Sequence, residues 1–215
     1  MYIGIAGNIG SGKSAMAELL CCEFGFRTFD SGDVANPYLS NFYADMQRWA
    51  LNLQVYFLTK RFKSIQRAMW SDDTVVQDRT IYEDAYIFVE NLLTMGLISR
   101  VDYNTYRELF EIMVSFIKPP ELLIYLKASV PTLVSHIRQR GLPYENAIGH
   151  EYLHMLNKKY DDWVGGYSGN ILTIDIDNTD FVNNAGDRMK AINAIRSQLP
   201  EPLLSQVDAW KAGRK

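Results

Sequence analysis

The chain has 215 residues, of which 47% are hydrophobic and 22% charged, and its formal net charge is −3. A chain of this size can bury one substantial core, which favours a single domain. The slightly negative charge and the absence of a Lys/Arg-rich run exclude a broad basic surface of the kind that holds nucleic acids. We therefore expect no nucleic-acid polymer as a partner.

The first residues, the apolar runs and the cysteines indicate the cellular compartment. Residues 1–6 carry no basic leader, and no window approaches about 18 uninterrupted apolar residues, so we expect neither a signal peptide nor a membrane partner. Cys21 and Cys22 are adjacent and cannot form a disulfide framework. These features predict a cytoplasmic protein in a reducing compartment.

Short apolar runs alternate with helical patterns along the chain. The runs have the length of strands and lie at residues 2–6, 26–29, 74–77, 122–126 and 171–176. Such alternation favours an α/β fold, in which helices surround a mostly parallel sheet.

The sequence permits two helices between residues 36 and 95. The stretch from Tyr38 to Met95 contains neither Gly nor Pro. A long helix can therefore begin near Asn36-Pro37, and a second one can follow Asp78.

The later helices have clearer ends. One is expected from about residue 102 to residue 117, where Lys118-Pro119-Pro120 stops it. The next has Pro131 in its first turn and ends at Gly141, a usual placement of these two residue types. The segment 200–215 has apolar residues at helical spacing, which leaves open whether it packs on the domain or on a partner.

A glycine-rich motif follows the first apolar run. It matches the pattern G-x-x-x-x-G-K-[ST] and reads Gly7-Asn8-Ile9-Gly10-Ser11-Gly12-Lys13-Ser14. Its glycines let backbone N–H groups face phosphates, Lys13 brings a positive charge to the β- and γ-phosphates, and Ser14 can ligate Mg²⁺. Because a strand pattern precedes it and a helical pattern follows, we expect a nucleoside triphosphate site rather than an ordinary turn.

An acid and an arginine close the third apolar run. Asp78 and Arg79 should lie at the carboxyl end of a strand, beside the phosphate loop. Asp78 can hold the metal or its water, and Arg79 can stabilise charge on a transferred phosphoryl group. The alternative is an acid–base pair that only fixes a turn.

Three polar side chains follow the first long helical pattern. If that helix is continuous, Tyr43, Gln54 and Arg61 share one face, because their spacings are close to whole turns. A hydroxyl, a carboxamide and a guanidinium in line can bind a sugar hydroxyl and a base edge. A solvated helix face is the alternative.

Several longer blocks resemble one known family. In chain order they are Asn36-Pro37-Tyr38-Leu39, Phe42-Tyr43, Gln54-Val55-Tyr56-Phe57-Leu58, Gln77-Asp78-Arg79-Thr80-Ile81-Tyr82-Glu83-Asp84, Pro119-Pro120-Glu121-Leu122-Leu123-Ile124-Tyr125-Leu126 and Arg140-Gly141. They are similar to the blocks of bacterial deoxynucleoside kinases, the deoxyadenosine/deoxyguanosine/deoxycytidine kinase family. The resemblance covers about residues 1–195.

The resemblance implies a fold, a reaction and an assembly. It implies a P-loop kinase domain over residues 1–199, with a five-stranded parallel sheet, surrounding helices, a short lid and a tail at 200–215. The implied reaction uses ATP and Mg²⁺ to phosphorylate a deoxynucleoside at its 5′-hydroxyl, a step of nucleotide salvage. A homodimer through a helix bundle is usual in this family, and a heterodimer with a related kinase subunit is the alternative.

The resemblance also assigns roles to single residues. The base-recognition set would be Gln54, Arg61 and Asp84, the 3′-hydroxyl contacts Tyr43 and Glu145, and the catalytic arginine Arg79. Beside Lys13, the lid keeps Arg140 as a phosphate contact, and Arg138 nearby would replace the missing arginine only if the lid rotates. The pair of Arg61 and Asp84 resembles the purine and deoxycytidine branch more than the thymidine branch. A purine deoxynucleoside is therefore the favoured substrate.

The proton acceptor departs from the family pattern. Relatives usually have a glutamate where this chain has Ser31, and serine is a poor general base. Asp30 and Asp33 flank the gap, and Asp33 is preferred because in an extended chain it lies on the same face as Ser31. Capping of the following helix is the alternative role for both aspartates.

The lid departs as well. The family commonly has Arg-Gly-Arg, whereas this chain has Arg140-Gly141-Leu142. Loss of one phosphate-facing arginine can cost several orders of magnitude in rate. Two other functions therefore stay open: a nucleotide-binding subunit with little activity, paired with an active kinase, and a nucleoside monophosphate kinase, for which the cationic residues around a substrate phosphate are not evident.

Overall fold

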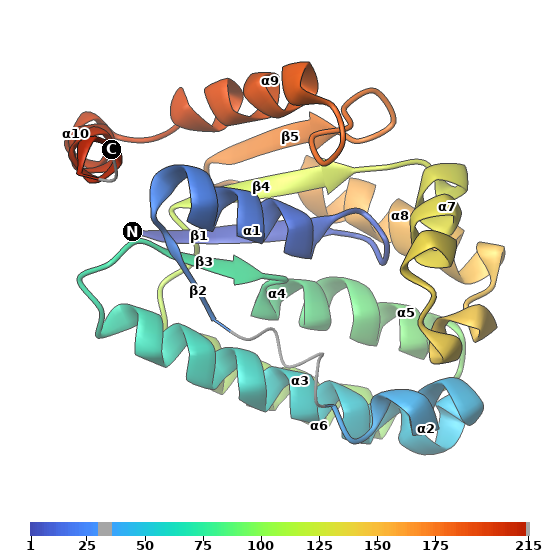
Figure 1. Cartoon of the computed structure of the whole chain (residues 1–215). Helices are drawn as coiled ribbons and strands as arrows, with labels where there is room; N and C mark the ends of the chain where they lie inside the picture. Colours follow the sequence, from blue (N-terminus) through green and yellow to red (C-terminus); the bar gives the residue numbers. More distant parts are fainter. Residues whose placement is uncertain (30–35, 214–215) are drawn as a thin grey trace.

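A parallel sheet forms the centre of the molecule. The computed structural model describes residues 1–29 and 36–213 (Figure 1). The strands are β1 (Tyr2–Gly7), β2 (Arg27–Phe29), β3 (Val75–Asp78), β4 (Leu122–Lys127) and β5 (Ile171–Asp175). They form one sheet in the order β2-β3-β1-β4-β5, and every neighbouring pair is parallel. The predicted α/β fold with five parallel strands is confirmed.

Helices cover both faces and the lower edge of this sheet. They are α1 (Lys13–Phe24), α2 (Leu39–Ala44), α3 (Met46–Met69), α4 (Ile81–Glu83), α5 (Val89–Thr94), α6 (Arg100–Val114), α7 (Val130–Arg140), α8 (His150–Gly165), α9 (Ala185–Arg196) and α10 (Glu201–Ala212). In Figure 1, α1 passes in front of the sheet, whereas α8 is fainter and lies behind it. A short 3₁₀ helix, η2 (Pro143–Ala147), links α7 to α8.

The strands are buried because nonpolar side chains pack on both faces of the sheet. Ile3, Ile5, Leu123 and Ile124 are fully buried in a core that also holds side chains of α1 and α8. A second core joins α2, α3, α5 and α6 below the sheet.

The long helix expected from Asn36-Pro37 is not continuous, so this prediction was wrong. The chain forms α2, breaks at Asp45 and starts again as α3. Asp45 has the extended dihedral angles φ −149° and ψ 84°, and its Oδ1 accepts a hydrogen bond of 3.0 Å from the N–H of Arg48. Helix α2 ends here although no Gly or Pro is present, because Asp45 caps the N-terminus of α3.

The helix after β3 contains an irregular turn. From Ile81 to Thr94 the path stays helical, but residues Asp84–Phe88 form a π turn, η1, in which the N–H of Val89 bonds the carbonyl of Asp84. π turns of this kind concentrate at functional sites.

The bounds of α6 differ from the expected 102–117. Ser99 caps α6, because its hydroxyl accepts a 3.0 Å bond from the N–H of Asp102, so the helix begins at Arg100. The helix ends at Val114, before the prolines that were expected to stop it. Helix α7 matches its prediction, with Gly141 in the left-handed conformation at φ +66° just past its end.

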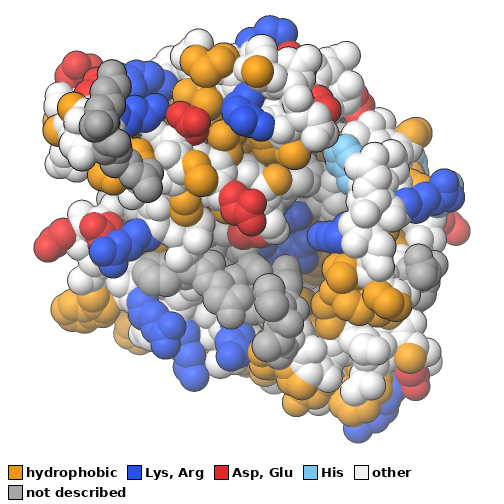
Figure 2. Space-filling model, viewed as in Figure 1, with side chains coloured by type: hydrophobic (Ala, Val, Ile, Leu, Met, Phe, Trp, Pro, Cys, Tyr) orange, Lys and Arg blue, Asp and Glu red, His pale blue; other side chains and the backbone are white. Residues whose placement is uncertain are grey.

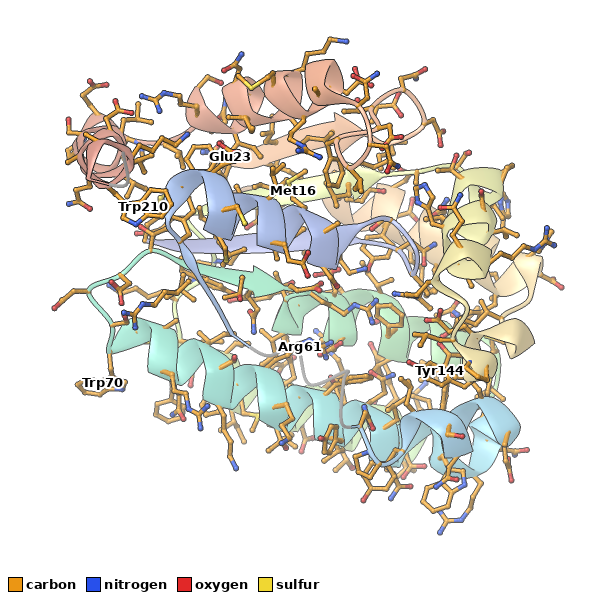
Figure 3. The ribbon with its side chains drawn as sticks, in the orientation of Figure 1. Met16, Glu23, Arg61, Trp70, Tyr144 and Trp210 are labelled. Atoms are coloured by element: carbon orange, nitrogen blue, oxygen red, sulfur yellow. The ribbon has the colours of Figure 1, made fainter. Side chains whose placement is uncertain are left out.

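The C-terminal segment packs on the domain. Val207 of α10 is buried in the sheet core, and Lys211 bonds Glu23 of α1 at 3.2 Å. Figure 3 shows Trp210 beside the end of α1 that carries Glu23. A Cβ atom on Gly25 would lie 2.6 Å from the Trp210 ring, so this glycine leaves room for the indole.

In the part of the chain that the structure describes, every helix is too short or too polar to span a bilayer.

Candidate active site

One cavity opens at the carboxyl ends of the central strands. Its volume is about 920 Å³, and residues of the phosphate loop, α2, α3, the end of β3, the lid and the loop before α9 line it. In Figure 2 it is visible as a hollow where blue basic atoms lie beside red acidic ones. Ligands of doubly wound sheets bind at this edge, where neighbouring crossovers turn to opposite faces.

The phosphate loop connects β1 to α1 as the sequence predicted. Gly10 has φ +85°, and a Cβ atom there would lie 2.8 Å from the carbonyl oxygen of Leu133. Lys13 Nζ donates to the carbonyl oxygens of Gly7 at 2.8 Å and Asn8 at 2.9 Å, so the ammonium lies over its own loop. The loop ends at the N-terminus of α1, whose first backbone N–H groups suit phosphate oxygens.

Asn8 connects the loop to the helix behind the sheet. Its side chain is buried and donates to the carbonyl of Leu153 at 3.0 Å and to Asn157 Oδ1 at 2.7 Å, both on α8. Its own Oδ1 accepts a 2.7 Å bond from the N–H of Ile9. The role of Asn8 is therefore to fix the loop, and it does not line the cavity.

Ser14 and Asp78 meet at the mouth of the loop. Ser14 Oγ donates to Asp78 Oδ2 at 2.6 Å, which brings the first turn of α1 to the end of β3. A hydroxyl and a carboxylate oxygen that converge next to a phosphate loop are the hard ligands that Mg²⁺ prefers. These two residues fit the metal position that the sequence predicted.

Arg79 lines the cavity and has an unusual backbone conformation. Its φ is +65°, and it is the single non-glycine residue with positive φ among the described residues. Its N–H bonds the carbonyl of Ile5 at 3.0 Å, and its guanidinium carbon lies 4.4 Å from the centre of the Phe88 ring. A left-handed arginine is a strained residue of the kind found at active sites.

Asp84 and Arg61 form a buried ion pair. Arg61 Nη1 lies 2.6 Å from Asp84 Oδ2, and each side chain is 1% exposed. Burial raises the pKa of Asp84 to about 6, while the charges of Arg61 and Arg79 favour its ionised form. Asp84 lines the cavity and Arg61 stands behind it, pointing from α3 into the protein in Figure 3.

Gln54 and Tyr43 also reach the cavity, from different helices. Gln54 of α3 is 4% exposed, and its Oε1 has no hydrogen-bond partner among the described residues. Tyr43 of α2 lines the same cavity, and burial raises the pKa of its hydroxyl. The break at Asp45 places Tyr43 on a separate helix, so the predicted common face holds only for Gln54 and Arg61.

The lid closes one side of the cavity. Arg140 Nε donates to Glu145 Oε2 at 2.9 Å, and Arg140 Nη2 pairs with Glu145 Oε1. Tyr144, seen beside α2 in Figure 3, stacks on Tyr43 with ring centres 5.9 Å apart. Leu142 lines the cavity, whereas Arg138 is exposed and does not line it.

Sequence reasoning missed the part of the cavity that α7 and the loop before α9 line. The lining residues in this part are Thr132, His136, Asp177, Asp180 and Phe181. His136 Nδ1 lies 2.8 Å from the carbonyl oxygen of Gly10, which ties α7 to the phosphate loop. Partial desolvation raises the pKa of the exposed Asp177, but hydrogen bonds from Thr132 and Ser129 together bring it below its usual value. No sequence motif marks these residues.

A buried carboxylate was also missed. Glu83 is fully buried, and it accepts bonds from the N–H groups of Thr80 at 2.6 Å and Gly7 at 3.2 Å. The pattern Thr80-x-x-Glu83 is a capping box, a signal that the sequence does contain. The candidate proton acceptors Asp30 and Asp33, and Ser31 between them, lie outside the described residues.

Comparison with known proteins identifies the family. A family model described as "Deoxynucleoside kinase" matches residues 3–200. A deoxyadenosine/deoxycytidine kinase of Bacillus subtilis (strain 168) is 35% identical over 198 residues, 91% of each chain. A deoxyguanosine kinase of Lactobacillus johnsonii is 35% identical over 219 residues, 97% of this chain and 96% of the relative.

A solved structure agrees with these sequence matches. Deoxyadenosine kinase from M. mycoides, with the products dCMP and a flexible dCDP bound, superposes with a TM-score of 0.81 at 28% identity. The match covers 92% of this chain and 100% of that one. The chain therefore belongs to the deoxynucleoside kinase family, whose members are phosphotransferases that act on deoxynucleosides.

Proposed function

We propose that this protein transfers the γ-phosphoryl group of ATP to the 5′-hydroxyl of a purine deoxynucleoside. The observation that carries the proposal is the single cavity of about 920 Å³, in which the phosphate loop and the polar side chains of Tyr43, Gln54 and Asp84 share one space. A donor and an acceptor held in one cavity can react without crossing solvent.

The donor end of the cavity is assigned to ATP. The backbone N–H groups of Lys13 and Ser14 at the start of α1, together with the Lys13 ammonium, bind the β- and γ-phosphates. Ser14 and Asp78 hold Mg²⁺, which when bound neutralises developing charge on the phosphate oxygens. The part of the cavity lined by His136 and Asp177 receives the base of ATP.

The acceptor end is assigned to the deoxynucleoside. Gln54 Oε1 and Asp84 Oδ1, which have no hydrogen-bond partner among the described residues, accept bonds from the N–H groups of the base. Arg61 holds Asp84 in place from behind. Tyr43 and Glu145 bind the 3′-hydroxyl, and relatives that act on deoxyadenosine or deoxyguanosine support a purine as the base.

Transfer requires charge stabilisation and a proton acceptor. Arg79 and Arg140 stabilise the negative charge on the transferred group. We assign the proton of the 5′-hydroxyl to Asp33, because Ser31 cannot act as a general base at neutral pH.

An activity panel with four deoxynucleosides tests the function. Purified protein with Mg-ATP should release ADP fastest with deoxyadenosine or deoxyguanosine. Asp33→Asn should lower kcat by about a hundredfold, since general-base catalysis contributes at least that much, whereas Asp30→Asn should change it little. Folded protein without turnover on any of the four would instead support a nucleotide-binding subunit, and preference for a monophosphate would support a monophosphate kinase.

We also propose that two copies of the chain pair through α6. Val101, Ile112 and Phe116 are 74%, 61% and 66% exposed, and their spacing places them on one side of the helix and its end. Large exposed apolar groups on one face usually mark an interface.

A further inference from the structure

Glu83 occupies a position that the proposed chemistry does not use. It is fully buried, comes one residue before Asp84 and is not part of the cavity lining. A buried carboxylate needs several hydrogen bonds to offset its desolvation. The partners of Glu83 therefore show what the residue serves.

One oxygen of Glu83 binds the turn that carries Arg79. Oε2 accepts from the N–H of Thr80 at 2.6 Å and from its hydroxyl at 3.0 Å. Thr80 directly follows Arg79, whose left-handed φ of +65° has to be held by its surroundings. The bond of 3.0 Å from the Arg79 N–H to Ile5 fixes one peptide group of Arg79, and Glu83 fixes the other.

The other oxygen binds the start of the phosphate loop. Oε1 lies 3.2 Å from the N–H of Gly7 and 2.8 Å from the hydroxyl of Tyr160. The same hydroxyl is 2.8 Å from the carbonyl oxygen of Gly7, which also accepts from Lys13. Burial raises the pKa of Tyr160, so the phenol stays protonated and able to donate.

The position of Tyr160 is itself fixed by packing. It is fully buried on α8, and its ring stacks on Tyr125 of β4 with centres 5.9 Å apart. The rings of Phe88 and Tyr160 are nearly perpendicular, with centres 6.5 Å apart. The guanidinium carbon of Arg79 lies 4.4 Å from the Phe88 ring centre. Tyr160 is thus a rigid support between the sheet and the catalytic arginine.

We propose that Glu83 and Tyr160 are positioning residues for phosphoryl transfer. The carboxylate spans the phosphate loop and the Arg79 turn, and so sets the distance between the phosphate to be transferred and the arginine that stabilises its charge. This inference rests on the proposed function. It assigns to two residues outside the cavity a role that the substrate contacts do not explain.

Such a role changes kcat more than binding. Arg79 acts on charge that develops in the transition state, so a shift of Arg79 lowers kcat while ground-state binding of ATP and nucleoside persists. A displacement of about 1 Å in a catalytic group can cost about a hundredfold in rate. A merely structural role would lower the Tm without this separation of kcat from KM.

The experiment compares two Glu–Tyr pairs of the same chain. In the test pair, Glu83→Gln should lower kcat about a hundredfold and Tyr160→Phe about tenfold, with both KM values within about threefold of wild type. The double variant should resemble Glu83→Gln, because both residues act in one network. The matched control is the pair of Glu90 and Tyr103, which joins α5 to α6 and lines no part of the cavity.

The control variants Glu90→Gln and Tyr103→Phe should lower the Tm by an amount similar to Tyr160→Phe and leave kcat within about twofold. If Glu83→Gln does not fold, Tyr160→Phe, which removes one hydroxyl, carries the test. Wild-type kcat in Tyr160→Phe, or a raised KM at unchanged kcat, overturns this inference alone. An inactive wild-type protein overturns the proposed function instead.

Discussion

Asp84 has the ionisable side chain on which the acceptor end of the cavity depends. It is fully buried, and its pKa rises to about 6 because water is excluded from it. Only the ionised form has acceptor oxygens for both Arg61 and a base amino group. Asp84 therefore connects nucleoside binding to pH.

The pH dependence of kcat/KM for the nucleoside tests this connection. Raising the pH through about 6 removes the proton from Asp84, so kcat/KM should rise about tenfold per pH unit below 6 and level off above it. Asp84→Asn should lower the plateau and remove this step, while steps due to ATP ionisation remain in both profiles. A step of equal size in the variant would show that another group titrates.

Helix α10 is the element whose role the sequence left open, and its packing makes it a stabilising element. Trp210 fills the space over Gly25, which has φ +71° and cannot carry a side chain in that place. Lys211 adds a contact to Glu23. Because these contacts lie at the end of α1 remote from the phosphate loop, they support the core more than the chemistry.

Thermal unfolding of Trp210→Ala tests this role. Loss of a half-buried indole should cost about 2 kcal/mol, which lowers the Tm by about 6 °C in a chain of this size. The value of kcat should stay within about twofold, since Trp210 touches none of the cavity. Trp70→Ala is the control: that indole is 91% exposed, points away from α3 in Figure 3, and should leave the Tm unchanged within about 1 °C. Equal losses from the two variants would contradict a docked α10.

At the level of the whole molecule, the exposed face of α6 predicts assembly. Wild-type protein should sediment as a dimer, and the double variant Ile112→Glu with Phe116→Glu should sediment as a monomer, because charges on the apolar face oppose its burial. A monomeric wild type, or a dimer that survives both charges, would place any interface elsewhere. Met189→Glu is a control, since this exposed residue is on α9.

The extent of sequence prediction follows from how local each signal is. The phosphate loop could be found because its residues are contiguous and its strand and helix flank it directly. The break at Asp45 could not, because a capping aspartate and an exposed helical aspartate look the same without the Arg48 N–H that turns toward it. The bond between His136 and Gly10 joins residues far apart in sequence, and no local pattern encodes it.

The same distinction between local and long-range signals applies to the site residues. The family resemblance predicted that Tyr43, Gln54 and Asp84 bind one substrate, and the structure places all three in one cavity. It did not reveal that Arg61 supports Asp84 from behind, since burial depends on packing of α3 against the second core. Asp33 stays a prediction.

The π turn at Asp84–Phe88 adds one residue to the path of its helix. Compared with a regular α-helix, every later side chain is rotated by about 100° about the helix axis relative to Glu83 and Asp84. Deletion of a single codon here would either swing Val89 and Leu92 out of the second core or pull the two acids from their partners. This stretch should therefore resist length variation during evolution more strongly than the loops around it, and an alignment that forces distant kinases through it without a gap would pair Asp84 with the wrong residue.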